Sequence, residues 1–296
     1  MYLLIGANGF LGSYVLKNII EQTSDKIVAT VRITENLYSS ERIIWKSCDV
    51  TDFSSVDLLS EYVKNISDGN LKVVYLAAYH NPDLVEKNPR VAWNVNVTSL
   101  SYFLNKLENV SCLFYPSTDS VYGESVDGYH FKETDHLNPV NTYGKQKVVA
   151  EQIVRGYGYN VVRYPFLISP SLSPGKKHFY DRIVEKLSSE QEIEMFSDSY
   201  RSTFSFDSAA RFLVQLMENY SASLPKTLNI CGDKALSKYD VGLMVAQKIG
   251  ACQELVKPVK VASANGIFEA KRASSTLMDN SKFKEIFSLK EIKLEL

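Results

Sequence analysis

Short apolar runs alternate with longer amphipathic segments along the first half of the chain. The apolar runs have the length and composition of buried strands, and the segments between them place apolar residues at helical spacing. We expect strands at Tyr2–Ile5, Ile27–Val31 and residues 73–77, 112–115 and 161–164, and helices at residues 54–65, 89–108 and 143–155. Strands of this kind, separated by helices, predict an α/β fold with a doubly wound parallel sheet that is covered on both faces.

Three glycines at three-residue spacing follow the first expected strand and open the first expected helix. Glycines at these positions allow a tight turn, a close approach of the backbone to a pyrophosphate, and close packing of helix on sheet. The amino end of the helix then faces the phosphates. We therefore expect a Rossmann-type dinucleotide site at Gly6, Asn8, Gly9, Phe10, Leu11 and Gly12.

Arg32 stands 20 residues after Gly12, at the end of the second expected strand. An acidic residue there holds the ribose 2′-OH of NAD, whereas a guanidinium suits a 2′-phosphate. NADP(H) is therefore the favoured cofactor and NAD(H) the alternative, unless Arg32 is only a surface charge. Asp49 and Val50 follow the expected end of a third strand, and we place them at the adenine side of the cofactor. Capping of the next helix is the other role for Asp49, and more so for Asp52.

Tyr143 and Lys147 share one helix face because they are four residues apart. An ammonium next to a phenol favours the phenolate, so we expect Lys147 to lower the tyrosine pKa from its usual value of about 10. A phenol tuned in this way can exchange a proton with an alcohol or a carbonyl near neutral pH. Together with a bound dinucleotide, the pair predicts hydride transfer at a C–OH/C=O centre.

The regular alternation of expected strands and helices ends after Pro165, where a turn-rich, basic stretch begins. Beyond it we expect a helix at residues 179–187, an apolar run at 203–206, a helix at 209–218, a strand at 227–231 and a helix at Lys238–Ile249. We divide the chain into a dinucleotide-binding unit, residues 1–165, and a smaller C-terminal α/β unit, residues 166–296. At least one strand and one helix of the second unit should return to the main sheet.

Several short motifs, weak singly, are specific in combination. They are residues 6–12, Leu76-Ala77-Ala78-Tyr79, Asn96, residues 116–123, residues 143–147, Arg163-Tyr164-Pro165 and residues 271–282. With this set the chain resembles the extended short-chain dehydrogenase/reductases, and within them the dTDP-4-dehydrorhamnose reductase group. The resemblance covers nearly the whole chain. It implies NAD(P) binding by residues 1–165 and mainly substrate binding by residues 166–296.

The resemblance also implies roles for single residues. Thr118 corresponds to the hydroxyl that binds the substrate carbonyl, Tyr143 to the general acid in reduction, and Lys147 to the ligand of the nicotinamide ribose. Asn96 resembles a catalytic asparagine, although Ser99 and Leu100 replace the Gly-Thr of that motif. The cofactor would also be lined by Leu76, Ala77, Ala78, Pro165 and Phe166.

The same resemblance indicates how a nucleotide-sugar substrate would be held. Arg201 resembles an arginine that contacts the substrate diphosphate, for which bidentate guanidinium–phosphate geometry gives a physical reason. Arg272 is a second candidate, as are Lys176 and Lys177, although surface lysines are common. The full set expected at the substrate is Thr118, Asp119, Ser120, Arg201 and Arg272.

Ser120 separates the reactions that relatives of this kind perform. The sugar-nucleotide 4,6-dehydratases carry Asp-Glu after the threonine, and the GDP-fucose synthases carry a cysteine near this point; here Asp119 is followed by Ser120. A hydroxyl is a poor base for a C–H proton. Reduction of an NDP-4-keto-6-deoxysugar at C4 is therefore the favoured reaction. A sugar-nucleotide 4-epimerase and a non-catalytic regulatory subunit that binds nucleotide stay open as alternatives.

The composition of the chain limits which partners, metals and cellular locations we expect. The net charge is −1, so no overall basic field would attract nucleic acid or an anionic membrane, and no apolar run has the roughly 18–20 residues of a membrane span. The four cysteines and four histidines show no metal-ligand spacing, so we expect no metal. The first strand starts at once after Met1, without a leader pattern, which favours a cytoplasmic protein. By analogy with relatives, a homodimer is one option for its assembly.

Overall fold

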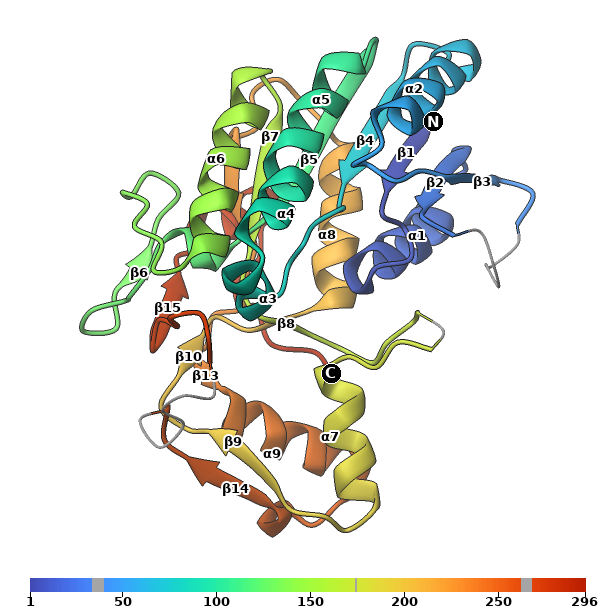
Figure 1. The fold of residues 1–296 in the computed structure, drawn as a ribbon. Coiled ribbons are helices and arrows are strands. Elements are labelled where there is room, and N and C mark those ends of the chain that lie inside the picture. The colour runs from blue at the N-terminus through green and yellow to red at the C-terminus, as the bar shows by residue number, and fades with distance from the viewer. Residues whose placement is uncertain (34–39, 174, 262–267) are drawn as a thin grey trace.

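A computed structural model describes residues 1–33, 40–173, 175–261 and 268–296. Its centre is a seven-stranded sheet in which every neighbouring pair is parallel, with the order β12-β7-β5-β4-β1-β2-β3. The strands are β1 Tyr2–Ile5, β2 Ile27–Val31, β3 Ile43–Ser47, β4 Leu71–Tyr75, β5 Val110–Thr118, β7 Asn160–Tyr164 and β12 Thr227–Asn229. The predicted doubly wound parallel sheet is confirmed (Figure 1).

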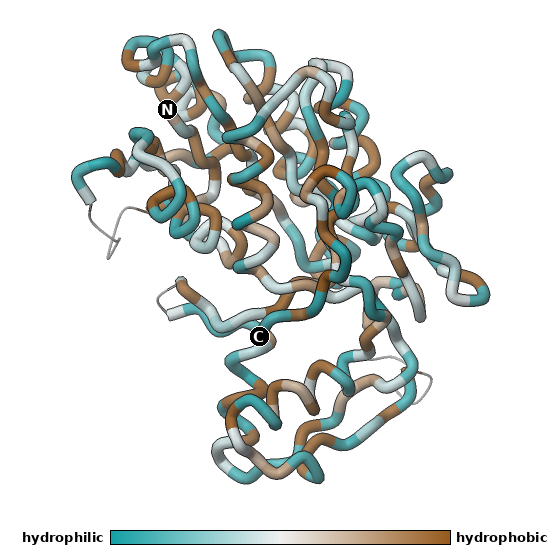
Figure 2. Tube along the Cα trace, turned by 180° about the vertical axis from the view of Figure 1, so that it is seen from behind, coloured by the Kyte–Doolittle hydropathy of each residue, from teal (hydrophilic) through white to brown (hydrophobic). Residues whose placement is uncertain are grey.

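Two layers of helices cover the sheet because alternate residues of each strand point to opposite faces. Tyr2 and Leu4 of β1 join a core with α1 and α8, whereas Leu3 and Ile5 join a core with α2, α5 and α6. The helices on the sheet are α1 Phe10–Gln22, α2 Phe53–Ile66, α5 Ser99–Lys106, α6 Thr142–Gly156, α8 Phe206–Glu218 and α10 Ser281–Phe287. Apolar segments run through the interior of this sandwich (Figure 2).

The helix expected at residues 89–108 is divided into three parts. After the short α3, Pro82–Lys87, the chain forms α4 Pro89–Trp93, a π-helical turn η1 Asn94–Thr98, and then α5. The Ser99 hydroxyl donates to the Asn94 carbonyl at 2.7 Å, which satisfies a backbone group inside the irregular turn. Such π-turns are frequent near functional sites, and this one carries Asn96.

The C-terminal lobe lies below the carboxyl edge of the sheet in Figure 1. Its own apolar core joins two helices and a parallel strand pair. These are α7 Phe179–Ser188, β9 Ile193–Phe196, α9 Lys238–Ile249 and β14 Val256–Val259, with a 3₁₀ turn η3 at Gln253–Leu255. Strand β12 leaves the lobe and pairs with β7 in the main sheet.

Short strand pairs connect the lobe to the sheet. A four-stranded sheet has the order β13-β10-β15-β6, and β8 pairs with β11. The strands are β6 His130–Phe131, β8 Leu167–Ile168, β10 Tyr200–Arg201, β11 Phe204–Ser205, β13 Leu236–Ser237 and β15 Ser275–Met278. These short strand pairs hold in place the segments that face the carboxyl edge of the main sheet.

Candidate active site

One cleft of about 1120 Å³ lies where the carboxyl edge of the sheet meets the C-terminal lobe. It includes the point between β1 and β4 where the strand order reverses, which is where open α/β sheets bind ligands. Pockets for one small ligand occupy roughly 300–1,000 Å³, so this cleft has room for more than one. Of the residues expected at a site, the cleft is lined by Gly6, Asn8, Gly9, Phe10, Leu11, Gly12, Arg32, Asp49, Val50, Leu76, Ala77, Ala78, Thr118, Asp119, Ser120, Tyr143, Lys147, Pro165, Phe166, Arg201 and Arg272.

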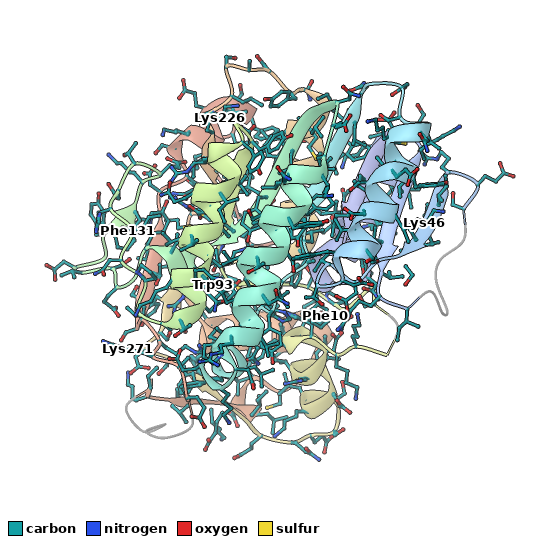
Figure 3. The ribbon with its side chains drawn as sticks, turned by 45° about the horizontal axis from the view of Figure 1, so that its top comes forward. Phe10, Lys46, Trp93, Phe131, Lys226 and Lys271 are labelled. Carbon is teal, nitrogen blue, oxygen red and sulfur yellow. The ribbon has the colours of Figure 1, made fainter. Side chains whose placement is uncertain are left out.

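Two positions of the glycine loop require glycine, one for its backbone conformation and one for lack of space. Gly6 has φ +85°, and a Cβ on Gly12 would stand 2.3 Å from the Gly6 carbonyl oxygen. Gly9 is the N-cap of α1, and Phe10, labelled in Figure 3, is its first residue. Both line the cleft, so the amino end of the helix lies at its wall. A compact loop at a helix amino end fits the pyrophosphate of a dinucleotide.

Arg32 is exposed at the end of β2 and lines the cleft beside Asp49. The Asp49 carboxylate accepts from the Thr51 amide at 2.9 Å and from the Thr51 hydroxyl at 2.7 Å. These bonds, with a smaller contribution from Arg32, hold the pKa of Asp49 below its usual value. Asp52 caps α2 by accepting from the Ser54 amide. Asp49 therefore keeps its carboxylate at the cleft, and capping belongs to Asp52.

Lys176, which the sequence analysis considered for the substrate diphosphate, contacts the glycine loop. Its ammonium donates to the Asn8 carbonyl at 2.8 Å, and the Ser173 hydroxyl donates to the same oxygen at 3.0 Å. His178, two residues on, packs edge-on against Phe10 with 4.7 Å between ring centroids. Lys177 pairs with Glu185 at 2.7 Å and does not line the cleft.

Tyr143 and Thr118 reach the cleft from neighbouring elements. Thr118 ends β5, and Tyr143 is in the first turn of α6, whose N-cap Asn141 accepts from the Gly144 amide. No hydrogen-bond partner of the Tyr143 hydroxyl is found within the described residues. Burial, and then the nearby Asp119, raises the pKa of Tyr143 above its usual value. The phenol is thus protonated at neutral pH, which suits a proton donor.

The expectation that Lys147 lowers the pKa of Tyr143 is wrong for this structure. The Lys147 ammonium donates to the Tyr115 hydroxyl at 2.6 Å and to the Pro116 carbonyl at 2.9 Å, so a different phenol takes its proton donors. Burial lowers the pKa of Lys147 to about 7, and Glu151 opposes that shift. Sequence reasoning placed Tyr115 only in a strand. Its pairing with Lys147 links residues 32 positions apart.

Asn96 differs from the other expected catalytic residues because it does not line the cleft. It is buried, and its side-chain amide exchanges two hydrogen bonds with the backbone of Tyr79, at 2.8 and 3.1 Å. It also donates to Gln146 of α6 at 2.9 Å. Asn96 therefore fixes the loop after β4 against α6, which is a positioning role and not contact with a ligand.

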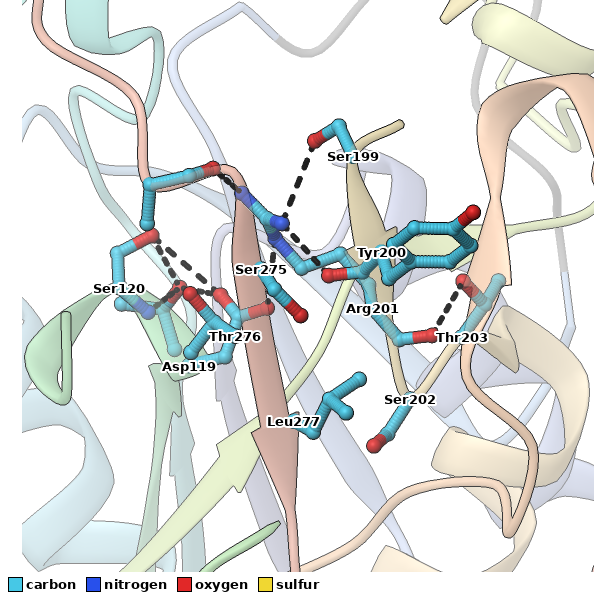
Figure 4. Close-up of polar contacts among 12 residues, drawn as sticks. Asp119, Ser120, Ser199, Tyr200, Arg201, Ser202, Thr203, Ser275, Thr276 and Leu277 are labelled. Atoms are coloured by element: carbon cyan, nitrogen blue, oxygen red, sulfur yellow. Dashed lines mark hydrogen bonds and ion pairs between the residues drawn. The ribbon is translucent and has the colours of Figure 1, made fainter. Parts of the chain in front are cut away.

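Asp119 and Arg201 both line the cleft and lie beside each other (Figure 4). The Asp119 carboxylate accepts from the Thr118 hydroxyl at 3.1 Å and lies 3.5 Å from the Arg201 Nε. Burial raises the pKa of Asp119, and the Arg201 charge opposes that shift. The Ser120 hydroxyl lies 3.2 Å from the Thr118 hydroxyl. These contacts order the hydroxyls at the end of β5.

The Arg201 guanidinium already makes several hydrogen bonds to the protein. It donates to the carbonyls of Tyr200 at 2.7 Å, Ala273 at 2.8 Å and Ser274 at 3.2 Å. Arg272 pairs with Asp83 at 2.7 Å, whereas its Nη1 is buried and has no hydrogen-bond partner within the described residues. Arg272 thus keeps a free N–H donor group, whereas Arg201 uses most of its donors in bonds to the protein.

The described residues show neither a metal-binding cluster nor a membrane-spanning helix. In that part of the chain, no three His, Cys, Asp or Glu side chains are grouped so as to hold a metal ion. None of the helices within it is both long and apolar enough to span a bilayer.

A family model described as "RmlD substrate binding domain" matches residues 1–295. The chain belongs to this family. A probable low-salt glycan biosynthesis reductase, Agl14 of Haloferax volcanii, is 26% identical to this RmlD-family chain over 263 residues, 87% of this chain and 83% of the relative. A dTDP-4-dehydrorhamnose reductase of Aggregatibacter actinomycetemcomitans is 23% identical over 303 residues, which cover 97% and 93%.

The fold is also shared with a solved structure. The dTDP-4-dehydrorhamnose reductase of Bacillus anthracis, solved in complex with NADP, matches with a TM-score of 0.79 at 18% identity, covering 99% of this chain and 94% of that one. Together with the family match, this likeness confirms the resemblance to the extended short-chain dehydrogenase/reductases of the RmlD type.

Proposed function

We propose that this chain is an NAD(P)H-dependent reductase of a nucleotide-linked 4-keto-6-deoxysugar. The observation that carries the proposal is the meeting of three features in one cleft: the glycine loop, the Thr118 hydroxyl and the protonated Tyr143 phenol. The loop fits a dinucleotide because the positive φ of Gly6 and the lack of room for a Cβ on Gly12 keep it compact at the amino end of α1. A bound NAD(P)H would supply hydride to C4 of the sugar.

The chain's own residues complete the reduction by handling the oxygen. The single O–H of Thr118, which bonds to Asp119 or Ser120 in this structure, would turn to the carbonyl oxygen, and Tyr143 would give that oxygen its proton. Lys147 would bind the nicotinamide ribose, and its contacts with Tyr115 and Pro116 hold the ammonium near the end of β5. Arg32 on the opposite side of the cleft favours NADPH over NADH.

Two features support reduction over the reactions of related enzymes. Elimination and C–H epimerisation need a base close to the threonine, and Ser120 supplies only a hydroxyl there. Asp119 is an acid, but it is buried under Arg201 and bonded to Thr118. Two relatives that match most of the chain are named as reductases, one of them of dTDP-4-dehydrorhamnose.

The test mixes purified protein with NADPH or NADH and a panel of 4-keto-6-deoxysugar nucleotides, and follows absorbance together with the product sugar. We expect stoichiometric oxidation of the dihydronicotinamide and a C4 alcohol in the product. Inversion of C4 in a sugar nucleotide without net NADPH consumption would assign a 4-epimerase instead. Nucleotide binding without turnover of any panel member would favour a regulatory subunit.

A further inference from the structure

Lys238 is the first residue of α9, and its ammonium lies in the wall of the cleft among three phenylalanine rings. The ring centroids of Phe179, Phe166 and Phe196 are 5.1, 5.8 and 6.0 Å away. Helix stability does not account for this lysine, because the first turn of a helix favours negative charge. The helix already has a capping box between Ser237 and Asp240.

No acidic side chain of the described residues pairs with Lys238. The two arginines beside it each have such a partner: Arg201 has Asp119 at 3.5 Å, and Arg272 has Asp83 at 2.7 Å. Burial, followed by the charges of these arginines, lowers the pKa of Lys238 to about 8. A partly desolvated cation next to two others is unfavourable unless an anion joins them.

Arg201, Lys238 and Arg272 all line the cleft, and they differ in how many of their donors are free. Arg201 spends most of its N–H groups on backbone carbonyls. Lys238 has three donors and no hydrogen-bond partner within the described part of the chain, and Arg272 keeps its buried, unpartnered Nη1. An anion at this part of the cleft would therefore find unused donors on these two residues.

We propose that Lys238 binds a phosphate of the substrate's nucleoside diphosphate, together with the Nη1 of Arg272. The proposal rests on the proposed function for the identity of the ligand. The three rings hold the ammonium in place by cation–π attraction and shield its contact with the phosphate from water. Lys238 is thus a specificity residue for phosphorylated sugars.

The test measures binding of dTDP, UDP, GDP, CDP and ADP by calorimetry, and continues with the tightest diphosphate and its parent nucleoside. For Lys238→Met we expect a loss of about ten- to a hundred-fold in diphosphate affinity, the size of a charge-assisted hydrogen bond. Nucleoside affinity should not change. Lys257→Met, an exposed lysine of the same lobe paired with Glu192, is the matched control and should bind as the unmodified protein does.

A second readout depends on the charge of Lys238. In the unmodified protein, diphosphate affinity should fall as the pH rises through about 8, because the ammonium is lost. The charged groups that face it are the arginines Arg201 and Arg272, and these stay charged over that range. In Lys238→Met the dependence should be absent.

The proposal is overturned if Lys238→Met binds diphosphate as tightly as the unmodified protein, if nucleoside affinity falls by the same factor, or if no diphosphate binds. The outcome is independent of catalysis, since no turnover is measured. A protein that shows the expected binding but reduces no keto-sugar would refute the proposed function and leave this inference standing. Keto-sugar reduction together with a diphosphate affinity that Lys238→Met does not change would refute this inference and leave the proposed function standing.

Discussion

Tyr115→Phe tests whether the phenol that holds Lys147 controls catalysis. The substitution removes one oxygen, which accepts from the Lys147 ammonium at 2.6 Å, and leaves the bond to the Pro116 carbonyl at 2.9 Å. Both side chains are buried, so water does not replace the lost acceptor. Without it the charged form of Lys147 is less stable, and its pKa falls below about 7.

The size of the shift follows from the contact. A hydrogen bond to a charged group contributes about 1.5–3 kcal/mol, and a pKa unit corresponds to about 1.4 kcal/mol, so the lysine pKa should fall by about one to two units. Lys147 is about half protonated at pH 7 in the unmodified protein. In the variant the protonated fraction at pH 7 is roughly a tenth to a hundredth, which predicts about 5- to 50-fold slower turnover.

The assay records kcat/KM for NADPH oxidation between pH 5 and 9. Because the ammonium is the form of Lys147 that would donate to the nicotinamide ribose, activity should decline as the pH rises through the lysine pKa, and Tyr115→Phe should move that decline about one to two units lower. Tyr75→Phe is the matched control, since the Tyr75 hydroxyl on the adjacent strand is buried and has no hydrogen-bond partner among the residues that the structure describes. An unmoved decline in Tyr115→Phe, or an equal shift in Tyr75→Phe, would refute this reasoning.

Three further outcomes are expected. Arg32→Asp should shift preference toward NADH, as measured by the ratio of kcat/KM for the two cofactors; an unchanged ratio would make Arg32 a surface charge only. Gly12→Ala should weaken NADPH binding about ten-fold or more, because its Cβ would meet a loop carbonyl oxygen at 2.3 Å, whereas Gly156→Ala, with nothing near the added atom, should bind normally in the same titration. Glu151→Ala should lower the free energy of unfolding by about 3–5 kcal/mol in denaturant titrations, because the buried Arg163 would lose the carboxylate that it contacts at 2.6 Å. A loss below about 1 kcal/mol would contradict this.

The sequence contained most of the fold because local patterns determine its longer elements. The helix expected at Lys238–Ile249 is found with those bounds, and that at 143–155 becomes Thr142–Gly156. Two-residue strands such as β8 and β10 were not predicted, since pairs this short carry no periodicity. Their pairing depends on segments that only the folded lobe brings together.

The site was predictable where motifs are local and unpredictable where contacts are distant. The glycine loop and the helical spacing of Tyr143 and Lys147 could be read directly from the sequence. The contact between Lys147 and Tyr115 could not be read from the sequence, because it forms only when α6 packs on β5 and nothing else distinguishes Tyr115 from other strand residues. Lys238 did leave a signal, a cation in the first turn of a capped helix, where acidic residues are favoured.

The central claim is that hydride reaches a sugar carbon while Tyr143 protonates its oxygen. The most direct measurement supplies NADPH deuterated at C4 of the nicotinamide and determines deuterium at C4 of the product sugar by mass spectrometry, for the unmodified protein and Tyr143→Phe. We predict deuterium transfer in the first and turnover lower by about 10²–10⁴ in the second, with NADPH affinity kept. A product without deuterium, or full turnover by Tyr143→Phe, would contradict the account.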